Sequence, residues 1–399
     1  MRVALFSDSF AEANGVATLS REFVEFASRR RLPFFSVHSG AKTQLTRQES
    51  VTTLELKRGP AAFRLDHDLY CDPLLTRYKN RVLSELRYFQ PHLVQITGPG
   101  DMGILGVWIA HLLQVPLIAS WHTNLHEYAA RRLENTLSFL TAAWREKITC
   151  FAEKQSLRAC VWFYRYGRFT LAPNQAMVDL LQERTRRPSF LMSHGVDTNV
   201  YTPSNRKRRD GPFCIGYVGR LTPEKNVHLL AGLERALLAA GKRDFRIVMV
   251  GEGSERDWLR KHLQFGELPG VLRGEDLAAA FADMDVFVFP SRTDTFGLVL
   301  LEAMASGVPV VVSPETAARV GIGNGITGFL AEDLNGFTQS VIRLIEDRML
   351  QREMGRAARS FSCLKAWDGV FDQVYRTYEI GLEMIGGAKR RRAEVPIAS

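Results

Sequence analysis

The stretch from Val286 to Gly307 constrains the fold more than any other part of the chain. It opens with the apolar run Val286-Phe287-Val288-Phe289, which is typical of a strand buried on both faces. A loop with Asp294 follows, and Phe296-Gly297-Leu298 then starts an apolar helix that contains Glu302. A parallel sheet binds anionic ligands where a strand ends in a loop and a helix N-terminus, so this stretch predicts such a site.

The residues of this stretch also indicate the kind of ligand. The N–H groups near Phe296, Gly297 and Leu298 suit phosphate oxygens. Asp294 and Glu302 are hydrogen-bond acceptors that suit hydroxyl groups, such as those of a sugar and a ribose. A phosphate beside a sugar and a ribose describes a nucleotide-sugar, which is the predicted ligand.

The length and charge of the chain limit its class. A chain of 399 residues is too long for one ordinary core and favours two domains. The net charge is +9, and positive residues cluster at 29–31, 206–209 and 389–392. Such clusters suit an anionic surface, a membrane or a nucleic acid, but solvated loops and tails are the favoured interpretation of each one alone. Nucleic acid is not a predicted partner.

Cysteine usage and hydropathy place the chain in a cellular context. Five cysteines are scattered without CxxC spacing, so no disulfide framework or metal site is predicted, and a reducing compartment is expected. Asp8 follows a short apolar run, so the N-terminus does not resemble a signal peptide. Residues 104–119 form the longest apolar region, but polar residues and a proline interrupt it, so it falls short of a membrane span. The expected protein is cytoplasmic, and soluble or peripheral on a membrane.

Strands and helices alternate in both halves of the chain. In the first half, strands are expected at 3–6, 34–37, 93–96 and 115–119, with helices near 74–89, 102–114 and 135–159. A polar, basic break at 203–212 reads as a linker. Strands then follow at 213–218, 245–250, 286–289 and 308–312, with helices at 225–240, 254–264 and 296–306. This rhythm predicts two doubly wound α/β domains with parallel sheets, and a cleft between their carboxyl edges.

A cationic segment follows the first strand of the second half. Arg220 offers a fork of donors and Lys225 a point charge, five residues apart across a turn into a helix. Both side chains can therefore converge on a diphosphate. Taken alone, the segment is better explained as a surface turn with an ion pair to Glu224. Beside the segment that contains Asp294 and Glu302, phosphate binding is the favoured interpretation.

Three loops of the first half carry weaker signals. Asn14-Gly15-Val16 follows a strand and opens a helix, and Gly15 lets the backbone approach a ligand closely. His122 lies just past the strand at 115–119, where it can hydrogen-bond to a sugar hydroxyl or transfer a proton, at even odds with a structural role. The loop His194-Gly195-Val196-Asp197 is either a hinge or a ligand loop.

Two further signals are discounted. Gly251-Glu252-Gly253 resembles the start of a dinucleotide fingerprint, but Arg256 stands where the third glycine belongs. Asp283 and Asp285 resemble a paired-carboxylate metal site, but they immediately precede a strand, at its amino end. They are interpreted as a helix-to-strand turn, and no metal is predicted.

Together these motifs resemble the retaining glycosyltransferases of family four, over nearly the whole chain. The most specific part is the carboxylate pair Asp294 and Glu302, separated by seven residues, with Thr295-Phe296-Gly297-Leu298 after the first acid. Further matches are Gly219-Arg220-Leu221 through Lys225, Gly195-Val196-Asp197, Asn14-Gly15-Val16 and His122-Thr123. The resemblance implies the GT-B fold, in which two Rossmann-like doubly wound domains face each other across a cleft.

The resemblance also implies roles for single residues. Arg220 and Lys225 would hold the donor diphosphate, Asp294 the sugar hydroxyls and Glu302 the ribose. Gly15 would lie near the phosphates and His122 near the sugar C6 hydroxyl. The donor-binding residues implied are Gly15, Arg220, Lys225, Asp294, Thr295, Phe296, Gly297, Leu298 and Glu302, with the base against 270–277. The catalytic residues implied are His122, Arg220, Lys225 and Asp294, and those on the acceptor side are Asn14, Asp101 and Thr123.

The same resemblance implies the domain boundaries. An acceptor-side domain would cover 1–200 and a donor domain 201–363. The last helix, about 364–385, would pack back on the first domain, and the basic tail 386–399 is expected to be disordered.

Two features point toward a lipid acceptor. The first acid is usually glutamate in the family and is Asp294 here. A branch that acts on glycerolipids, with sulfoquinovosyl-, glucosyl- and mannosyl-lipid enzymes, also resembles Thr293-Asp294-Thr295-Phe296-Gly297. The basic and apolar residues of Arg77–Arg87 suit a membrane surface, unless Val82, Leu83 and Leu86 pack on the sheet instead.

The expected reaction is hexose transfer from a donor of the GDP-mannose or UDP-glucose type to a hydroxyl of a lipid or glycolipid. The configuration would be retained, and no metal or other cofactor is expected. One alternative is a nucleotide-sugar epimerase or hydrolase on the same scaffold. Another is a non-catalytic nucleotide-sugar-binding protein, and the sequence leaves both open.

Overall fold

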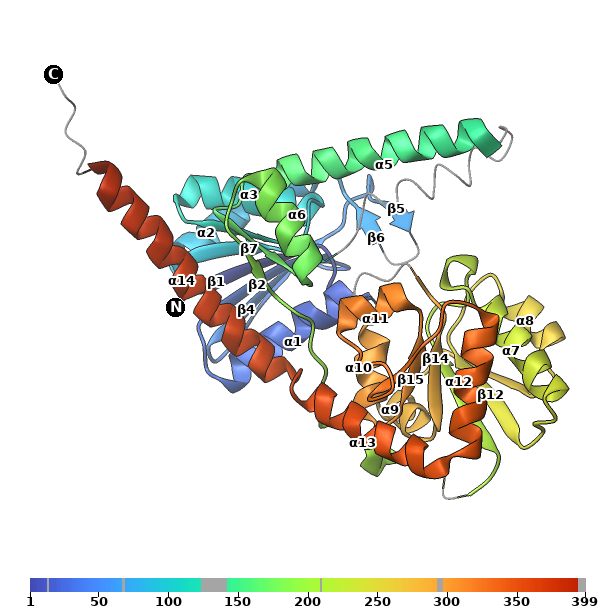
Figure 1. Cartoon of the computed structure of the whole chain (residues 1–399). Helices are drawn as coiled ribbons and strands as arrows, with labels where there is room; N and C mark the ends of the chain where they lie inside the picture. Colours follow the sequence, from blue (N-terminus) through green and yellow to red (C-terminus); the bar gives the residue numbers. More distant parts are fainter. Residues whose placement is uncertain (13, 67–68, 123–141, 209, 293–296, 394–399) are drawn as a thin grey trace. The chain divides into compact units, whose positions relative to one another are not determined.

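The computed structural model describes residues 1–12, 14–66, 69–122, 142–208, 210–292 and 297–393. The chain divides into two compact units (Figure 1). The first unit comprises residues 1–193 and 370–399, and the second comprises residues 194–369. The first change of unit therefore falls between Ser193 and His194, and not at residue 200 as expected.

The first unit is built on an eight-stranded sheet in the order β10-β9-β8-β7-β1-β2-β4-β3. The strands are β1 (Val3–Ser7), β2 (Phe34–Gly40), β3 (Gln44–Gln48), β4 (Val51–Lys57), β7 (Leu93–Ile96), β8 (Leu117–Ser120), β9 (Phe169–Ala172) and β10 (Ser189–Leu191). Every pair is parallel except β3 with β4. A separate hairpin joins β5 (Phe63–Asp66) to β6 (Leu69–Cys71).

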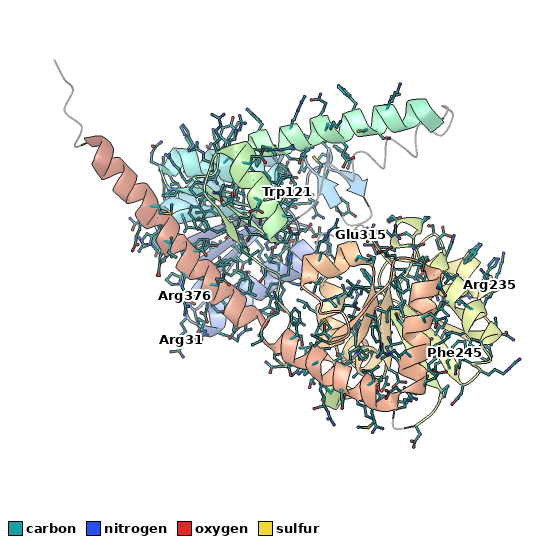
Figure 2. All side chains as sticks on the ribbon, in the orientation of Figure 1. Arg31, Trp121, Arg235, Phe245, Glu315 and Arg376 are labelled. Carbon is teal, nitrogen blue, oxygen red and sulfur yellow. The ribbon has the colours of Figure 1, made fainter. Side chains whose placement is uncertain are left out.

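Helices flank this sheet, and apolar side chains fill the space between the layers. The helices are α1 (Gly15–Arg29), the short 3-10 helix η1 (Leu75–Tyr78), α2 (Lys79–Phe89), α3 (Asp101–Leu113), α5 (Ala142–Tyr164), α6 (Gln175–Thr185) and α14 (Trp367–Ala393). Trp121, which Figure 2 labels, is fully buried, and its ring centroid lies 4.9 Å from that of Tyr164 on α5. The predicted apolar region 104–119 thus divides into most of α3 and the start of β8.

The last helix, α14, packs on the first unit, as the resemblance implied. The ring of Phe371 stacks on that of Phe23 at 4.3 Å, and Arg30 pairs with Asp372 at 3.1 Å. The last helix was expected to end near residue 385, with a disordered tail after it. This expectation is wrong for residues 386–393, because α14 continues to Ala393. Residues 388–393 are alanine, lysine and arginine, all strong helix formers, and the next proline is Pro396.

The second unit contains a six-stranded parallel sheet in the order β13-β12-β11-β14-β15-β16. The strands are β11 (Phe213–Val218), β12 (Phe245–Val250), β13 (Gly266–Gly270), β14 (Val286–Phe289), β15 (Val310–Val312) and β16 (Gly328–Leu330). The helices are η2 (Pro203–Asn205), η3 (Pro223–Lys225), α7 (His228–Ala239), α8 (Arg256–His262), α9 (Gly274–Ala282), α10 (Leu298–Ala305), α11 (Pro314–Val320), α12 (Leu334–Glu346) and α13 (Arg348–Cys363).

Local sequence signals set several of these helices. Asn14 caps α1 by accepting a hydrogen bond from the Ala17 N–H at 2.9 Å, and Asp333 caps α12 in the same way through Gly336 N–H at 2.8 Å. Asp347 caps α13 through two N–H groups. Gly321, at φ +85°, ends α11 in the left-handed conformation that glycine adopts without strain.

The strand orders fix where ligands can approach each unit. In the second sheet the order of the strands reverses between β11 and β14, and in the first sheet it reverses between β1 and β7. In doubly wound sheets the crevice that accepts a ligand lies outside the carboxyl ends of the strands at this reversal. The loops that follow β1, β7, β11 and β14 are therefore expected to form the ligand sites of the two units.

The loop 194–197 lies where the chain enters the second unit. Val196 N–H donates to the Lys365 carbonyl at 3.0 Å, so this segment pairs with the one that precedes α14. A Cβ at Gly195 would stand 2.7 Å from the Trp367 ring, so the pairing requires glycine there. This contact favours the hinge interpretation over a ligand loop.

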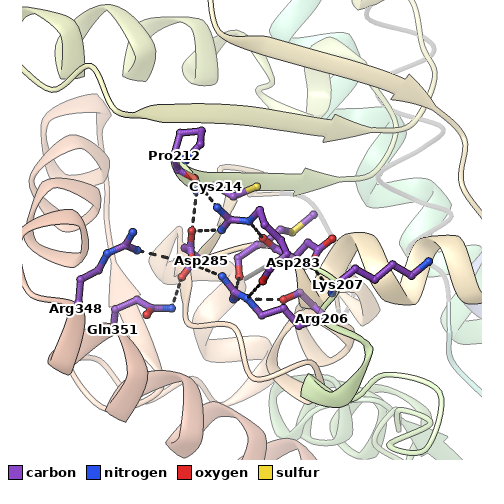
Figure 3. A network of polar contacts seen from close by, with 11 residues as sticks. Arg206, Lys207, Pro212, Cys214, Asp283, Asp285, Arg348 and Gln351 are labelled. Atoms are coloured by element: carbon purple, nitrogen blue, oxygen red, sulfur yellow. Dashed lines mark hydrogen bonds and ion pairs between the residues drawn. The ribbon is translucent and has the colours of Figure 1, made fainter. Parts of the chain in front are cut away.

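Residues 206–208 of the basic cluster bind the acidic pair Asp283 and Asp285 (Figure 3). Arg206 pairs with Asp285 at 2.7 Å, and Arg208 pairs with its other carboxylate oxygen. The N–H groups of Lys207 and Arg208 both donate to Asp283 Oδ1 at 2.8 Å. The pair is a turn before β14, as expected, and the basic cluster is held by its own chain instead of being a solvated linker.

No helix among the described residues combines the length and apolar character that a membrane span requires.

Candidate functional site

Arg220 and Lys225 lie in the loop that follows β11, at the carboxyl edge of the second sheet. The loop leaves the strand through Gly219 at φ +154°. Tyr217 Oη donates to the Arg220 carbonyl at 2.9 Å, and Leu221 N–H donates to the Glu252 carbonyl at 2.9 Å. The backbone of this loop is therefore fixed on both sides.

The glycines of Gly251-Glu252-Gly253 serve this packing. A Cβ at Gly251 would stand 1.9 Å from the Gly219 carbonyl oxygen, and one at Gly253 would stand 2.2 Å from the Leu221 carbonyl oxygen. Only glycine lets the loops after β11 and β12 approach so closely. The two glycines thus support the Arg220 loop, which explains them without a dinucleotide fingerprint.

The two cationic side chains differ in their surroundings. Arg220 lies 3.9 Å from Glu224, so the ion pair considered from the sequence is present, at the long end of such contacts and partly exposed. A partly exposed ion pair of this kind adds little stability. Lys225 is only 9% exposed. The loop thus carries a guanidinium and a buried lysine five residues apart in the chain.

The loop after β14 faces the same crevice, because β14 is the direct neighbour of β11. Its start is anchored: the Ser291 carbonyl accepts hydrogen bonds from Ser313 Oγ at 2.9 Å and from Thr316 Oγ1 at 2.6 Å. Gly297 then begins α10 in the left-handed conformation, at φ +76°, with no side-chain cap hydrogen bond. Asp294, Thr295 and Phe296 lie outside the described residues.

Glu302 lies in the second turn of α10. Burial raises the pKa of its carboxyl group to about 7, and a hydrogen bond with Tyr201 acts in the opposite direction. A neutral acid can donate to an oxygen, and an ionised one can accept from two neighbouring hydroxyls. Tyr201 precedes the second sheet by several residues, so nothing in the sequence pattern links it to α10.

The first unit contains a pocket of about 430 Å³ at the carboxyl ends of β1 and β7, its own point of strand reversal. Asp101, expected on the acceptor side, is part of the wall. Described residues that line it are Asp8, Ser9, Val16, Tyr70, Cys71, Asp72, Pro73, Leu75, Thr76, Thr97, Gly98, Pro99, Gly100, Asp101, Ile104 and Tyr164.

Asp8 is the residue of this pocket that the sequence analysis missed. Its backbone N–H donates to Thr97 Oγ1 at 3.0 Å, and its carboxylate accepts from the N–H groups of Gly100 and Gly103 at 3.4 and 3.3 Å. A Cβ at Gly100 would stand 2.4 Å from Asp8 Oδ1, so that glycine makes room for the carboxylate. Burial, and next the charge of Asp101, raise the pKa of Asp8 to about 7.

The other described residues of the first unit that the sequence nominated are His122, Gly15 and Asn14. His122 follows β8 by two residues and is 5% exposed, so it stands at the carboxyl edge as expected. Gly15 is the first residue of α1, and Asn14 serves as its cap and donates to Ser9 Oγ at 3.2 Å. Thr123 lies outside the described residues.

The apolar residues of the segment Arg77–Arg87 pack on the sheet and do not form a membrane-facing surface. Val82 and Leu86 are fully buried, and Leu83 packs against the same core. Arg81 and Arg87 are exposed. The apolar residues of α2 therefore face the sheet, and the interpretation in which they face a membrane is wrong.

Each half of the chain matches a family model of glycosyltransferases. Residues 13–200 match the model of Glycosyltransferase Family 4, and residues 212–347 match that of Glycosyl transferases group 1. A GDP-mannose-dependent alpha-mannosyltransferase of Mycolicibacterium smegmatis is 33% identical over 75% of this chain and 76% of its own length. The sulfoquinovosyl transferase SQD2 of Arabidopsis thaliana is 31% identical over 72% of this chain and 56% of its own length.

Solved structures agree on the architecture. Sucrose-phosphate synthase of Thermosynechococcus elongatus superimposes with a TM-score of 0.71 at 16% identity, over 96% of this chain and 100% of the other. HepE of Anabaena in complex with UDP and glucose gives a TM-score of 0.68 at 17% identity, over 95% and 100%. Identities this low show the fold alone, whereas the sequence matches show the family. The chain is therefore a member of the family-four glycosyltransferases and has the GT-B fold.

Proposed function

We propose that this chain transfers a hexose from a nucleoside-diphosphate sugar to a hydroxyl acceptor with retention of configuration. The observation that carries the proposal is that β11 and β14 are neighbouring parallel strands, so that Arg220 and Lys225, after β11, and the N-terminus of α10, after β14, belong to the same edge of the sheet. Cationic side chains and helix N–H groups at one sheet edge are what a diphosphate needs.

The chemistry follows from where charge develops. Departure of the diphosphate leaves negative charge near Arg220 and Lys225, and preorganised donors stabilise such charge in a site shielded from water. Glu302 suits the paired hydroxyls of a ribose, and Asp294, by the family resemblance, the hydroxyls of the sugar. We infer same-face attack, in which the leaving phosphate takes the proton of the acceptor hydroxyl. Neither a metal ion nor a covalent glycosyl-enzyme forms part of this mechanism.

The names of the relatives indicate which donor to test first. Three relatives, of which the one from Mycolicibacterium smegmatis is an example, are GDP-mannose-dependent alpha-mannosyltransferases. A donor of the GDP-mannose type is thus the first to test, with UDP-glucose next.

A lipid or glycolipid acceptor has support from the outer face of α3. Ile104, Trp108 and Leu112 follow one another at four-residue intervals and are 42%, 49% and 44% exposed. This spacing forms one stripe along a helix. Lys79 Nζ lies 5.8 Å from the centroid of the Trp108 ring, which adds a cation beside the stripe. An apolar stripe edged by positive charge suits an anionic membrane surface, and Ile104 also lines the pocket.

Purified protein with GDP- and UDP-hexoses, with and without lipid extract, tests the proposal. Transfer to an acceptor with an α-linked product from an α-linked donor supports it. Donor turnover that needs no acceptor instead supports the hydrolase or epimerase alternative. Tight nucleotide-sugar binding without any turnover supports the binding-protein alternative, and a glycosylated peptide that carries Asp294 would replace same-face attack with a covalent mechanism.

A further inference from the structure

The pocket at the ends of β1 and β7 is acidic. Asp8, Asp72 and Asp101 line it, and none of the described lining residues is a lysine or an arginine. Two arginines near this wall are already paired: Arg77 with Asp72 of the pocket at 2.9 Å, and Arg58 with Glu12. An anion that entered the pocket would therefore meet the carboxyl groups of Asp8 and Asp101, which form no ion pair within the part of the chain that the structure describes.

The N-terminus of α3, which would otherwise attract an anion, already holds one. Asp8 accepts from the Gly100 and Gly103 N–H groups, as described above. Asp101 accepts from the N–H groups of Met102 at 2.9 Å and Asp72 at 2.8 Å. The backbone donors that usually bind phosphate at a helix N-terminus are therefore satisfied by the protein's own carboxylates.

The other described residues of the wall are uncharged: some are apolar, some are glycines, and some carry hydroxyl or thiol groups. Val16, Leu75, Ile104 and the Tyr164 ring contribute apolar surface. Sugar rings and glycerol chains present C–H groups beside hydroxyls, so an apolar wall with carboxylate acceptors matches them. A volume of about 430 Å³ lies within the range of small-molecule sites.

We infer that this pocket binds the acceptor through an uncharged polyol group, such as a neutral sugar ring or a glycerol moiety, and rejects acceptors with a phosphate or carboxylate at that position. The identification of the ligand as the acceptor rests on the proposed function. The carboxylates of Asp8 and Asp101 accept hydrogen bonds from the hydroxyls. The near-neutral pKa of Asp8 lets it also donate one when it is protonated.

Cys71 offers a direct readout of occupancy, because it lines the pocket, whereas the exposed Cys150 and Cys363 serve as internal references. The full-length protein is alkylated with N-ethylmaleimide, and each cysteine peptide is quantified. Methyl α-glucopyranoside and glycerol, at high millimolar concentration, are expected to slow the modification of Cys71 at least threefold and to leave Cys150 and Cys363 unchanged. Glucose 6-phosphate and glucuronate at the same concentration are expected to leave all three rates unchanged. Equal or better protection by the anionic probes, or no protection by any neutral polyol, overturns the inference.

A charge-changing variant supplies a test that loss of folding cannot imitate. Thr76 lines the pocket and is partly exposed. Thr76→Arg places a cation there and is expected to make glucose 6-phosphate protect Cys71, whereas the uncharged control Thr76→Gln is not. Absence of this gain in a folded Thr76→Arg protein contradicts the charge argument.

The two proposals fail separately. If no donor is turned over but neutral polyols still protect Cys71, then the transferase proposal fails and the ligand class of the pocket stands. If transfer occurs but proceeds best with an acceptor whose phosphate protects Cys71, then the pocket inference fails and the transferase proposal stands.

Discussion

Asp8 illustrates how one acid can set the chemistry of a pocket. Its carboxylate occupies the N-terminus of α3, against glycines that leave room for it. The neighbouring Asp101 raises the pKa of Asp8, because a second negative charge disfavours ionisation of the first. Between about pH 6 and pH 8 the protonation of Asp8 therefore changes, and so does its ability to donate to a hydroxyl.

Asp101→Asn is expected to lower the pKa of Asp8 from about 7, because it removes the repulsive charge and keeps the shape of the side chain. Carboxyl-carbon NMR of ¹³C-labelled aspartate, followed from pH 4 to pH 9, measures the shift. Asp179→Asn on α6, on the exposed side of the same unit, is the control and should leave the titration unchanged. An Asp8 midpoint that stays near 7 in Asp101→Asn would show that burial alone sets it.

Lys225→Ala and Glu302→Ala are each expected to lower turnover at least tenfold, about 1.4 kcal/mol or more, because they would remove the diphosphate and ribose contacts that we propose for them. Steady-state kinetics with the active donor measure the effect. Lys261→Ala, on the exposed side of α8 in the same unit, is the control. Unchanged kinetics in both test variants would remove these two residues from the donor site.

Sequence reasoning could nominate donor-side residues because their signal is local. Arg220, Lys225 and Glu302 each follow a strand within one strand–loop–helix unit, and the order of β11 and β14 brings those units together. Asp8 went unrecognised because its partners, Gly100 and Gly103, are about ninety residues away in the chain. A further clue was present, since an acid directly after the first strand of a parallel sheet points to the carboxyl edge.

At the scale of elements, the outer stripe of α3 provides a test of the lipid acceptor. Trp108→Ser and Ile104→Ser remove apolar area from an exposed face, and burying such area in a bilayer stabilises binding by about 25 cal/mol per Å². Each variant is expected to lower co-sedimentation with vesicles that contain anionic lipid severalfold. Ile380→Ser on α14, at 51% exposure, is a matched control and should leave binding unchanged. Equal binding by all three variants would exclude the stripe as the membrane contact.

Most strands expected from strong apolar runs were predicted to within two residues, whereas β2 continues three residues past its expected end, to Gly40. Some of the differences have clear physical causes. β15 starts at Val310 instead of residue 308. Pro309, which has no N–H group, immediately precedes it. β3 has the polar sequence Gln44-Leu45-Thr46-Arg47-Gln48 and exists only through its antiparallel pairing with β4. A strand that is stabilised mainly by pairing with another strand need not show an alternating or apolar sequence pattern, so it is hard to predict.

At the scale of the whole molecule, each unit has its own hydrophobic core. The break at 203–212 reads as a linker because it is polar and basic, yet Arg206 and Arg208 attach it to Asp285 of the second unit. The change of unit therefore precedes this segment. The ion pairs join segments about eighty residues apart, so a polar, basic composition did not make this segment a linker. Pairing over such a distance cannot be predicted from the local sequence.

The same network makes a prediction about stability. Burial opposes the ionisation of Asp285, but hydrogen bonds from Arg206 and the Cys214 N–H, together with the charges of Arg206 and Arg208, hold its pKa below its ordinary value. Asp285→Ala removes the shared partner of three arginines, Arg206, Arg208 and Arg348. Loss of one member of a buried pair costs about 3–5 kcal/mol, and urea unfolding of the second unit should show a loss of that order. Asp257→Ala on α8, an exposed acid, is the control and should change the free energy of unfolding by no more than about 0.5 kcal/mol.

The pH dependence separates the charge of Asp285 from its shape. A carboxyl group whose pKa is lower in the folded state stabilises the fold at pH values above its unfolded pKa, about 3.9, and the contribution is lost as the pH falls through the folded value. The stability gap between the wild type and Asp285→Asn is therefore expected to be full near pH 7 and to shrink below about pH 4. A gap that stays constant across this range would assign the effect to packing, and the attachment of the basic segment to the second unit would then not depend on charge.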